Sequence, residues 1–230
     1  MESIATIGQA VAIISACWAV ISGVGAWKRE FIGKRRIELA EEVLATFFEI
    51  KDAIASIRHA FSSTDEGKTR QRGEHETKEE SNLLDRGYIV FERYEAQKEI
   101  FQKFNTLKYR FMAAFGEDTE EIFTEINRTL NKIFISSRML VEHYWQRQGR
   151  VEMSKEEFAK HLEEMHKHEG IFWDTMSEED EVRKKLQKIQ TKLEATTKPV
   201  FEEPIKTYSI LTSKWAWANT YQAPVRQGHK

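Results

Sequence analysis

The feature that most constrains this chain is a stretch without charge near its N-terminus. Residues 4–27 contain no Asp, Glu, Lys or Arg, and the nearest charged residues are Glu2 and Lys28. A helix needs roughly 20 mostly apolar residues to cross the hydrocarbon core of a bilayer at about 1.5 Å per residue. Residues 4–27 meet this requirement, so the sequence predicts a transmembrane helix.

The charges around this stretch predict its orientation. Residues 28–36 hold several basic side chains and one acidic side chain. Basic flanks stay on the cytoplasmic side, and Trp favours the membrane interface. A cleaved signal peptide would carry its basic residues before the apolar part. We therefore expect a retained single-pass anchor in the inner (plasma) membrane, with the N-terminus outside and the remaining chain in the cytoplasm. The expected membrane-flanking residues are Trp27, Lys28, Arg29, Lys34, Arg35 and Arg36.

The predicted span has one face of small residues and an opposite face of bulky ones. The small residues recur at spacings of three and four, which places them on one side of a helix. Close backbone contact over small residues is a main source of helix association in lipid. We expect a parallel homo-oligomer through this face, although Ala, Gly and Ser are also common in spans that do not associate. The small face comprises Gly8, Ala12, Ser15, Ala19, Ser22 and Ala26, and the bulky face comprises Ile4, Ile7, Val11, Ile14, Trp18 and Ile21.

Composition and motifs argue against several function classes. The chain has 35 basic and 37 acidic residues, so no broad basic surface for nucleic acid is expected. The single cysteine, Cys17, lies in the predicted span, which excludes a disulfide within one chain. The sequence contains neither a glycine-rich phosphate loop nor a Gly-x-Ser-x-Gly elbow. We expect no cofactor and no enzymatic activity, and the residues suggest no known family.

Beyond residue 31, apolar residues recur at helical spacing. Residues 62–82 contain no Leu, Ile, Val, Met or aromatic residue and therefore predict a mobile loop. Asp118, Ser154 and Ser177 are expected to begin helices, and Pro199 is expected to stop the last one. The expected helices cover residues 83–115, 118–145, 154–170 and 177–199, with the aromatic residues of the first facing the core.

These patterns predict an all-α protein. We expect a single N-terminal transmembrane helix with its basic flank (1–31), followed by a cytosolic antiparallel helical bundle (32–199) with a coiled-coil-like seam near its end. An aromatic C-terminal tail (200–230) completes the chain. Trp215, Trp217 and Tyr221 in this tail either pack across the bundle or bind a protein partner or membrane surface.

One histidine cluster is a candidate metal site. His161, Glu164 and His168 are spaced to share one helix face, and imidazoles with a carboxylate can hold zinc or iron. The surrounding residues are polar on every side, so we prefer a solvated helix face and predict no metal.

The favoured function is a membrane-tethered, self-associating helical scaffold or sensor module. It would bind the lipid bilayer, a second copy of itself and an unknown cytosolic protein, without enzymatic activity. The alternative is an oligomeric transmembrane pore or channel gated by the cytosolic bundle, with Gln9, Ser15 and Ser22 lining a narrow path.

Overall fold

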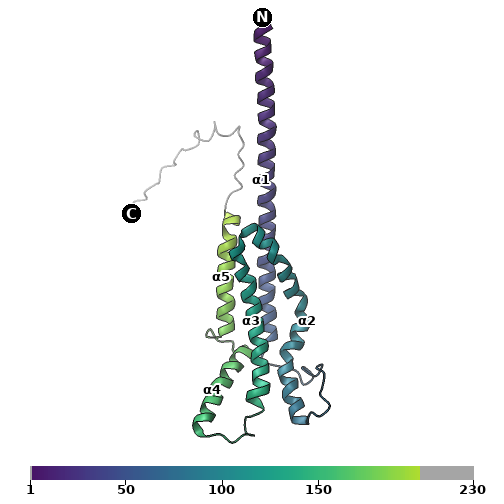
Figure 1. Cartoon of the computed structure of the whole chain (residues 1–230), viewed down its shortest axis with the longest axis vertical. Helices are drawn as coiled ribbons and strands as arrows, with labels where there is room; N and C mark the ends of the chain where they lie inside the picture. Colours follow the sequence, from purple (N-terminus) through teal and green to yellow (C-terminus); the bar gives the residue numbers. More distant parts are fainter. Residues whose placement is uncertain (1, 203–230) are drawn as a thin grey trace, which may run out of the picture. The chain divides into compact units, whose positions relative to one another are not determined.

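The computed structural model describes the backbone of residues 2–202 and the side chains from Gly8 onward. Over these residues the chain is helical and contains no β-strand, so the predicted all-α class is confirmed for this part. The elements are α1 (Glu2–Ile57), α2 (Lys78–Phe115), the 3₁₀ turn η1 (Glu117–Thr119), α3 (Glu120–Met139), the π-helical turn η2 (Leu140–Trp145), α4 (Lys155–Phe172) and α5 (Glu181–Glu202). Figure 1 labels the α-helices.

The chain divides into two compact units. Glu38–Pro199 form one of them, called the helical unit below, and the first part of α1, up to Ile37, belongs to the other. The first part of α1 is long and apolar enough to cross a membrane, and none of its most apolar 18-residue window is buried. The expected apolar helix near the N-terminus is therefore present.

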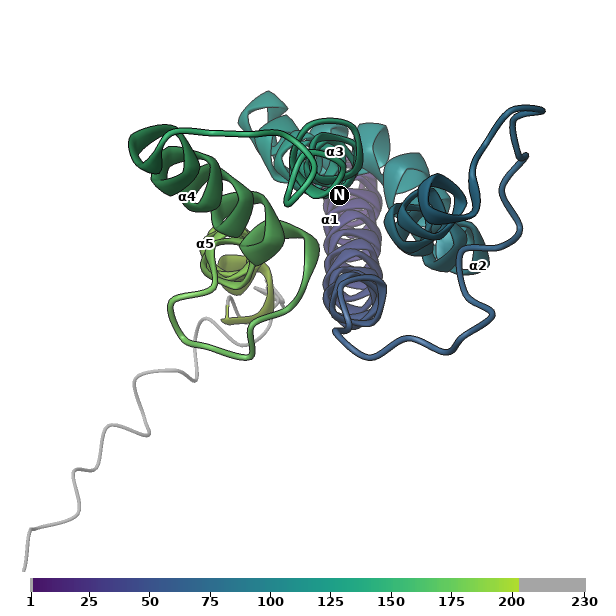
Figure 2. The same ribbon diagram turned by 90° about the horizontal axis from the view of Figure 1, so that it is seen from below.

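The core of the helical unit is built on the second part of α1. Val43, Phe47, Ile50, Ile54 and Ile57 are buried and recur at spacings of four and three, which lines them along one helix face. Figure 2 shows α2 and α5 on opposite sides of this part of α1. Burying each such side chain stabilises the fold by about 1.5–3 kcal/mol.

Helices α2, α3 and α4 complete this core. Helix α3 contacts both α2 and α4. Phe101, Phe104 and Phe111 of α2 are buried, as the aromatic spacing predicted. The centroids of the Phe104 and Phe123 rings lie 4.5 Å apart, which packs α2 directly against α3.

Two helix starts depend on reciprocal capping. At Ser154 the hydroxyl accepts from the Glu157 backbone N–H, and the Glu157 carboxylate accepts from the Ser154 N–H, which confirms that predicted start. The same capping box at Thr77 and Glu80 begins α2 five residues before the predicted position, Leu83. The apolar pattern alone missed this start because the first turn of α2 is polar.

Three other predicted boundaries are wrong. Ser177 does not begin α5, which starts at Glu181 after the cap Asp180. Asp118 does not cap α3: it lies in η1, and α3 begins after Thr119, whose hydroxyl donates to the Gly116 carbonyl at 2.6 Å. Pro199 does not stop α5, which continues to Glu202. A proline removes only one helical hydrogen bond, and here that loss falls in the last described turn.

Candidate functional site

The apolar segment of α1, residues 8–27, exposes its bulky side chains. Ile14 and Ile21 are 68% and 71% exposed, and Trp18 is also exposed. A row of large, exposed apolar side chains along a helix is typical of a surface that contacts lipid or another apolar surface. This segment is therefore the first candidate functional site.

The small face of the segment is regular because α1 is helical throughout. Gly8, Ala12, Ser15 and Ala19 are exposed, and Ser22 and Ala26 are partly exposed. The Ser15 hydroxyl donates to the Val11 carbonyl at 2.8 Å, so its hydrogen is satisfied within its own helix. Such internal pairing makes Ser compatible with hydrocarbon. Association of two copies through this face stays a prediction.

The basic flank begins with an aromatic pair. The Trp27 and Phe31 rings stack with centroids 5.6 Å apart, and the Arg35 guanidinium lies 5.3 Å from the Phe31 centroid. Trp27, Lys28, Arg29, Lys34, Arg35 and Arg36 are all exposed. The sequence change from apolar to charged residues thus coincides with an aromatic and cationic surface, which is typical of a membrane interface.

Arg58 is the most buried cation of the helical unit, with its side chain 2% exposed. It follows α1 directly, and its Nη1 and Nη2 donate to the two carboxylate oxygens of Asp180 at 2.9 and 2.8 Å. Carbonyl oxygens at the end of α4 also accept from Arg58: Nε donates to Ile171 at 2.7 Å, and Nη2, whose two hydrogens are shared among three acceptors, lies 2.8 Å from the carbonyl oxygens of Gly170 and Trp173. A cation at these unpaired carbonyls also complements the helix dipole. Arg58 therefore joins the end of α1 to the end of α4 and the start of α5.

Asp180 is the other half of this pair. Its carboxylate accepts from the Arg183 backbone N–H at 2.9 Å, so it caps α5, and from the Thr175 hydroxyl at 3.1 Å. Burial by itself raises the pKa of Asp180, but the hydrogen bonds from Arg58 and the Arg183 N–H outweigh it and lower the pKa to about 2. Asp180 is therefore ionised at neutral pH.

Arg93 of α2 donates to carbonyl oxygens at the end of α1, as Arg58 does at the end of α4. Its Nη1 donates to the His59 carbonyl at 2.6 Å and to the Ile57 carbonyl at 3.3 Å. Its Nη2 also donates to the Glu66 carboxylate at 2.8 Å, and this hydrogen bond lowers the pKa of Glu66. Two arginines thus pair with the carbonyl ends of two helices in one unit.

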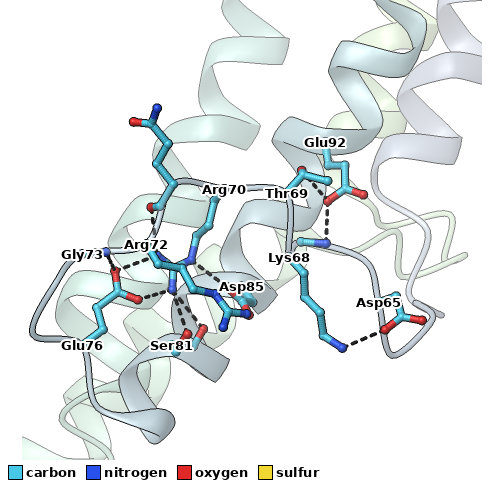
Figure 3. Close-up of polar contacts among 12 residues, drawn as sticks. Asp65, Lys68, Thr69, Arg70, Arg72, Gly73, Glu76, Ser81, Asp85 and Glu92 are labelled. Carbon is cyan, nitrogen blue, oxygen red and sulfur yellow. Dashed lines mark hydrogen bonds and ion pairs between the residues drawn. The ribbon is translucent and has the colours of Figure 1, made fainter.

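The segment between α1 and α2 is tied to α2 by side chains (Figure 3). Arg70 donates to Asp85 at 2.7 Å and forms an ion pair with Glu76. Its hydrogen bond lowers the pKa of Glu76 to about 2. Glu92 accepts from the Gly67 N–H at 2.7 Å. Gly67 has φ +83, and a Cβ there would lie 1.9 Å from the Asp85 carbonyl oxygen, so this approach requires glycine.

These contacts fall in the loop predicted over residues 62–82. Its last five residues belong to α2, and its centre carries Arg70, whose side chain is 8% exposed. No apolar pattern marks this segment, because polar pairing, rather than apolar burial, connects it to the helix. Mobility of this segment stays a prediction.

Two neighbouring hollows lie near Arg58. A cavity of about 330 Å³ is lined by Lys51, Arg58, Asp174 and Arg183 among others, and an open groove of about 800 Å³ by Phe61, Arg93 and Met176 among others. Most of the charged groups in the cavity already have partners: Lys51 donates to Gln190 at 2.6 Å and Arg183 to Asp174 at 3.0 Å. In the groove, Phe61 and Met176 are 78% and 63% exposed, and such exposed apolar side chains often mark a contact surface.

The histidine cluster does not form a ligand set. His161 and His168 each lie with their ring centroid 5.4 Å from that of Tyr144, and Glu164 pairs with a neighbouring lysine at 3.7 Å. Across residues 2–202, no three His, Cys, Asp or Glu side chains are grouped so that they could hold a metal ion. The solvated-face interpretation is wrong for His161, which is buried because α4 turns this face toward η2. Burial also lowers the pKa of His168.

Sequence reasoning missed Arg58, Arg70 and Arg93. A signal existed for Arg58: it follows Ile54 by four residues and so continues the apolar face of α1. A charge on such a face needs a buried partner. The expected partner-binding residues Trp215, Trp217 and Tyr221 lie outside the described residues.

The comparisons with known proteins do not assign this chain to a family. No protein-family model, no curated protein and no solved structure matches the sequence or the fold.

Proposed function

We propose that this protein is a membrane-tethered, self-associating helical module that acts as a scaffold or sensor for a cytosolic partner and has no enzymatic activity. The observation that carries the proposal is the charge-free first part of α1, whose bulky side chains are exposed along a continuous helix. Water is a poor solvent for such a surface, whereas hydrocarbon suits it.

The charge distribution supports a single orientation. The basic flank follows the apolar segment, so the N-terminus would lie outside and the helical unit in the cytoplasm. In this arrangement residues 38–199 form an antiparallel bundle presented at the membrane. The buried arginine contacts would keep its helix ends fixed, as a docking platform requires.

Two surfaces support partner binding. One is the open groove with exposed Phe61 and Met176. The other is the aromatic tail with Trp215, Trp217 and Tyr221, a composition that favours protein or interface contact.

Self-association through the small face gives the sharpest test. In the full-length protein in mild detergent, Ala12→Leu with Ala19→Leu should reduce the oligomer to a monomer, because larger side chains hold the backbones apart. Light scattering corrected for bound detergent would measure the mass. The matched control is Val11→Leu with Ile14→Leu on the bulky face, which should leave the mass unchanged. An unchanged mass in the small-face variant, or a monomeric parent protein, would contradict the proposal.

The alternative is an oligomeric pore gated by the cytosolic bundle. It is favoured by the polar groups of Gln9, Ser15 and Ser22 on or beside the small face. The Ser15 hydroxyl donates to the Val11 carbonyl, and its oxygen can still accept from water, so this hydrogen bond fits either proposal. Ion flux separates the two proposals.

A further inference from the structure

The cations after the apolar segment lie mostly on one side of the helix. α1 is helical through residues 2–57, so each residue turns by about 100°. On this geometry Lys28, Arg29, Arg35 and Arg36, called the cationic face below, fall within an arc of about 120°. All four are exposed, and Glu30 and Lys34 lie outside the arc. The face has two tiers about 10.5 Å apart along the axis.

The cationic face continues the bulky face of the span. Arg29 follows Val11 by eighteen residues, which is about five full turns, and Arg36 follows Trp18 by the same interval. The side chains of each pair therefore point in the same direction from the axis. The bulky face and the cations thus share one side of α1.

The small face continues into different residues. Glu30 follows Ala12 by eighteen residues and Gly33 follows Ser15 by the same interval, again about five turns. If small faces meet between copies, the side turned toward the neighbouring copy carries Glu30 and Gly33. On the same geometry Lys28 and Arg35 lie about 160–180° from the centre of the small face and so turn away from that contact, whereas Arg36 lies about 80° and Arg29 about 60° from it.

We propose that the cationic face binds the headgroups of anionic phospholipids in the leaflet where Trp27 lies. This inference rests on the proposed function, because it requires residues 4–27 to span the bilayer. The bulky face points into lipid tails, so cations on the same side meet lipid headgroups first. The contact of Arg35 with Phe31, 5.3 Å from the ring centroid, places its guanidinium beside an aromatic group suited to the interface.

The test compares two neighbouring cations of equal charge. Full-length protein is reconstituted into phosphatidylcholine vesicles containing a minority of phosphatidylglycerol and extracted with a mild neutral detergent. Mass spectrometry then measures the ratio of the two lipids that remain bound. The parent protein should retain phosphatidylglycerol above its proportion in the vesicles, and Arg35→Gln should reduce that enrichment about fivefold. Lys34→Gln removes the same charge outside the face and should change it much less.

The outcomes separate this inference from the proposed function. Equal losses in the two variants, or no enrichment in the parent protein, would overturn the cationic face while leaving the anchor intact. Failure of the parent protein to float with vesicles of phosphatidylcholine alone would instead overturn the anchor. High salt during extraction should lower the enrichment of the parent protein, because exposed charges are screened.

Discussion

At the scale of single residues, Arg58 and Asp180 show how one buried ion pair can organise helix ends. Each nitrogen of the Arg58 guanidinium has an acceptor, and both oxygens of Asp180 have donors. A buried pair is not by itself stabilising relative to apolar residues, because removing two charges from water is costly. Once both charges are buried, however, removing either one leaves the other without compensation.

Arg58→Ala should therefore destabilise the helical unit by about 3–5 kcal/mol. Urea unfolding of the full-length protein in detergent, followed by far-ultraviolet circular dichroism, would measure the change. The control is Arg110→Ala, whose exposed pair with Glu42 spans 3.5 Å and should contribute less than about 1 kcal/mol. A similar decrease in the unfolding free energy of the two variants would show that the buried Arg58 network stabilises the protein no more than an exposed ion pair does.

The low pKa of Asp180 predicts a pH dependence. The folded pKa of about 2 lies below the ordinary value of 3.8, so folding favours the ionised carboxylate. Its contribution, about 2 kcal/mol, is fully present above pH about 4 and is lost as the pH falls toward 2. Asp180→Asn should be less stable at neutral pH and should lose less additional stability between pH 4 and 2. A variant with an unchanged acid limb in the unfolding free energy would contradict this assignment.

At the scale of elements, the packing of α2 against the end of α3 depends on a glycine, Gly87. A Cβ on Gly87 would lie 2.2 Å from Cγ2 of Val141 in η2. The Ser137 hydroxyl donates to the Gly87 carbonyl at 2.6 Å, which is possible because the two backbones approach closely. The π-helical turn that contains Val141 interrupts the regular α-helical register, so its contacts do not follow from the spacing of α3.

Gly87→Ala should destabilise the helical unit by about 1–3 kcal/mol through overpacking, and adding Val141→Ala should restore part of the loss. Gly170→Ala in α4 is the matched control, because a Cβ there meets nothing within 4 Å. It should stabilise the protein by about 0.5–1 kcal/mol, since alanine loses less backbone entropy in a helix than glycine. The urea midpoint should fall for Gly87→Ala and rise for Gly170→Ala. Midpoints that shift in the same direction would contradict overpacking at Gly87 as the cause.

At the scale of the whole molecule, the two units suit different solvents. The first part of α1 exposes its apolar side chains, whereas the helical unit buries Phe47, Phe111 and Phe172 and carries its charged pairs mostly on the surface. This division supports one part for lipid and one for water. It also leads to a prediction about whether ions cross a bilayer that contains the protein.

Proteoliposomes that contain the full-length protein should stay sealed to monovalent ions. In the proposed oligomer the small faces pack closely and would leave no water path, while the bulky faces would meet lipid. The release of trapped potassium ions from these vesicles, compared with release from vesicles without protein, would test this. Steady flux above that background, abolished by Ser15→Leu, would favour the pore and contradict the tether.

The sequence by itself determined the helical class, the apolar N-terminal helix, the end of α2 at Phe115 and the cap at Ser154. These features depend on local periodicity and on groups a few residues apart. Only the tertiary structure decided the partners of Arg58, Arg70 and Arg93. Their acceptors lie far along the chain or in polar segments without a pattern, and a charge is stable inside a fold only where packing brings those acceptors to it.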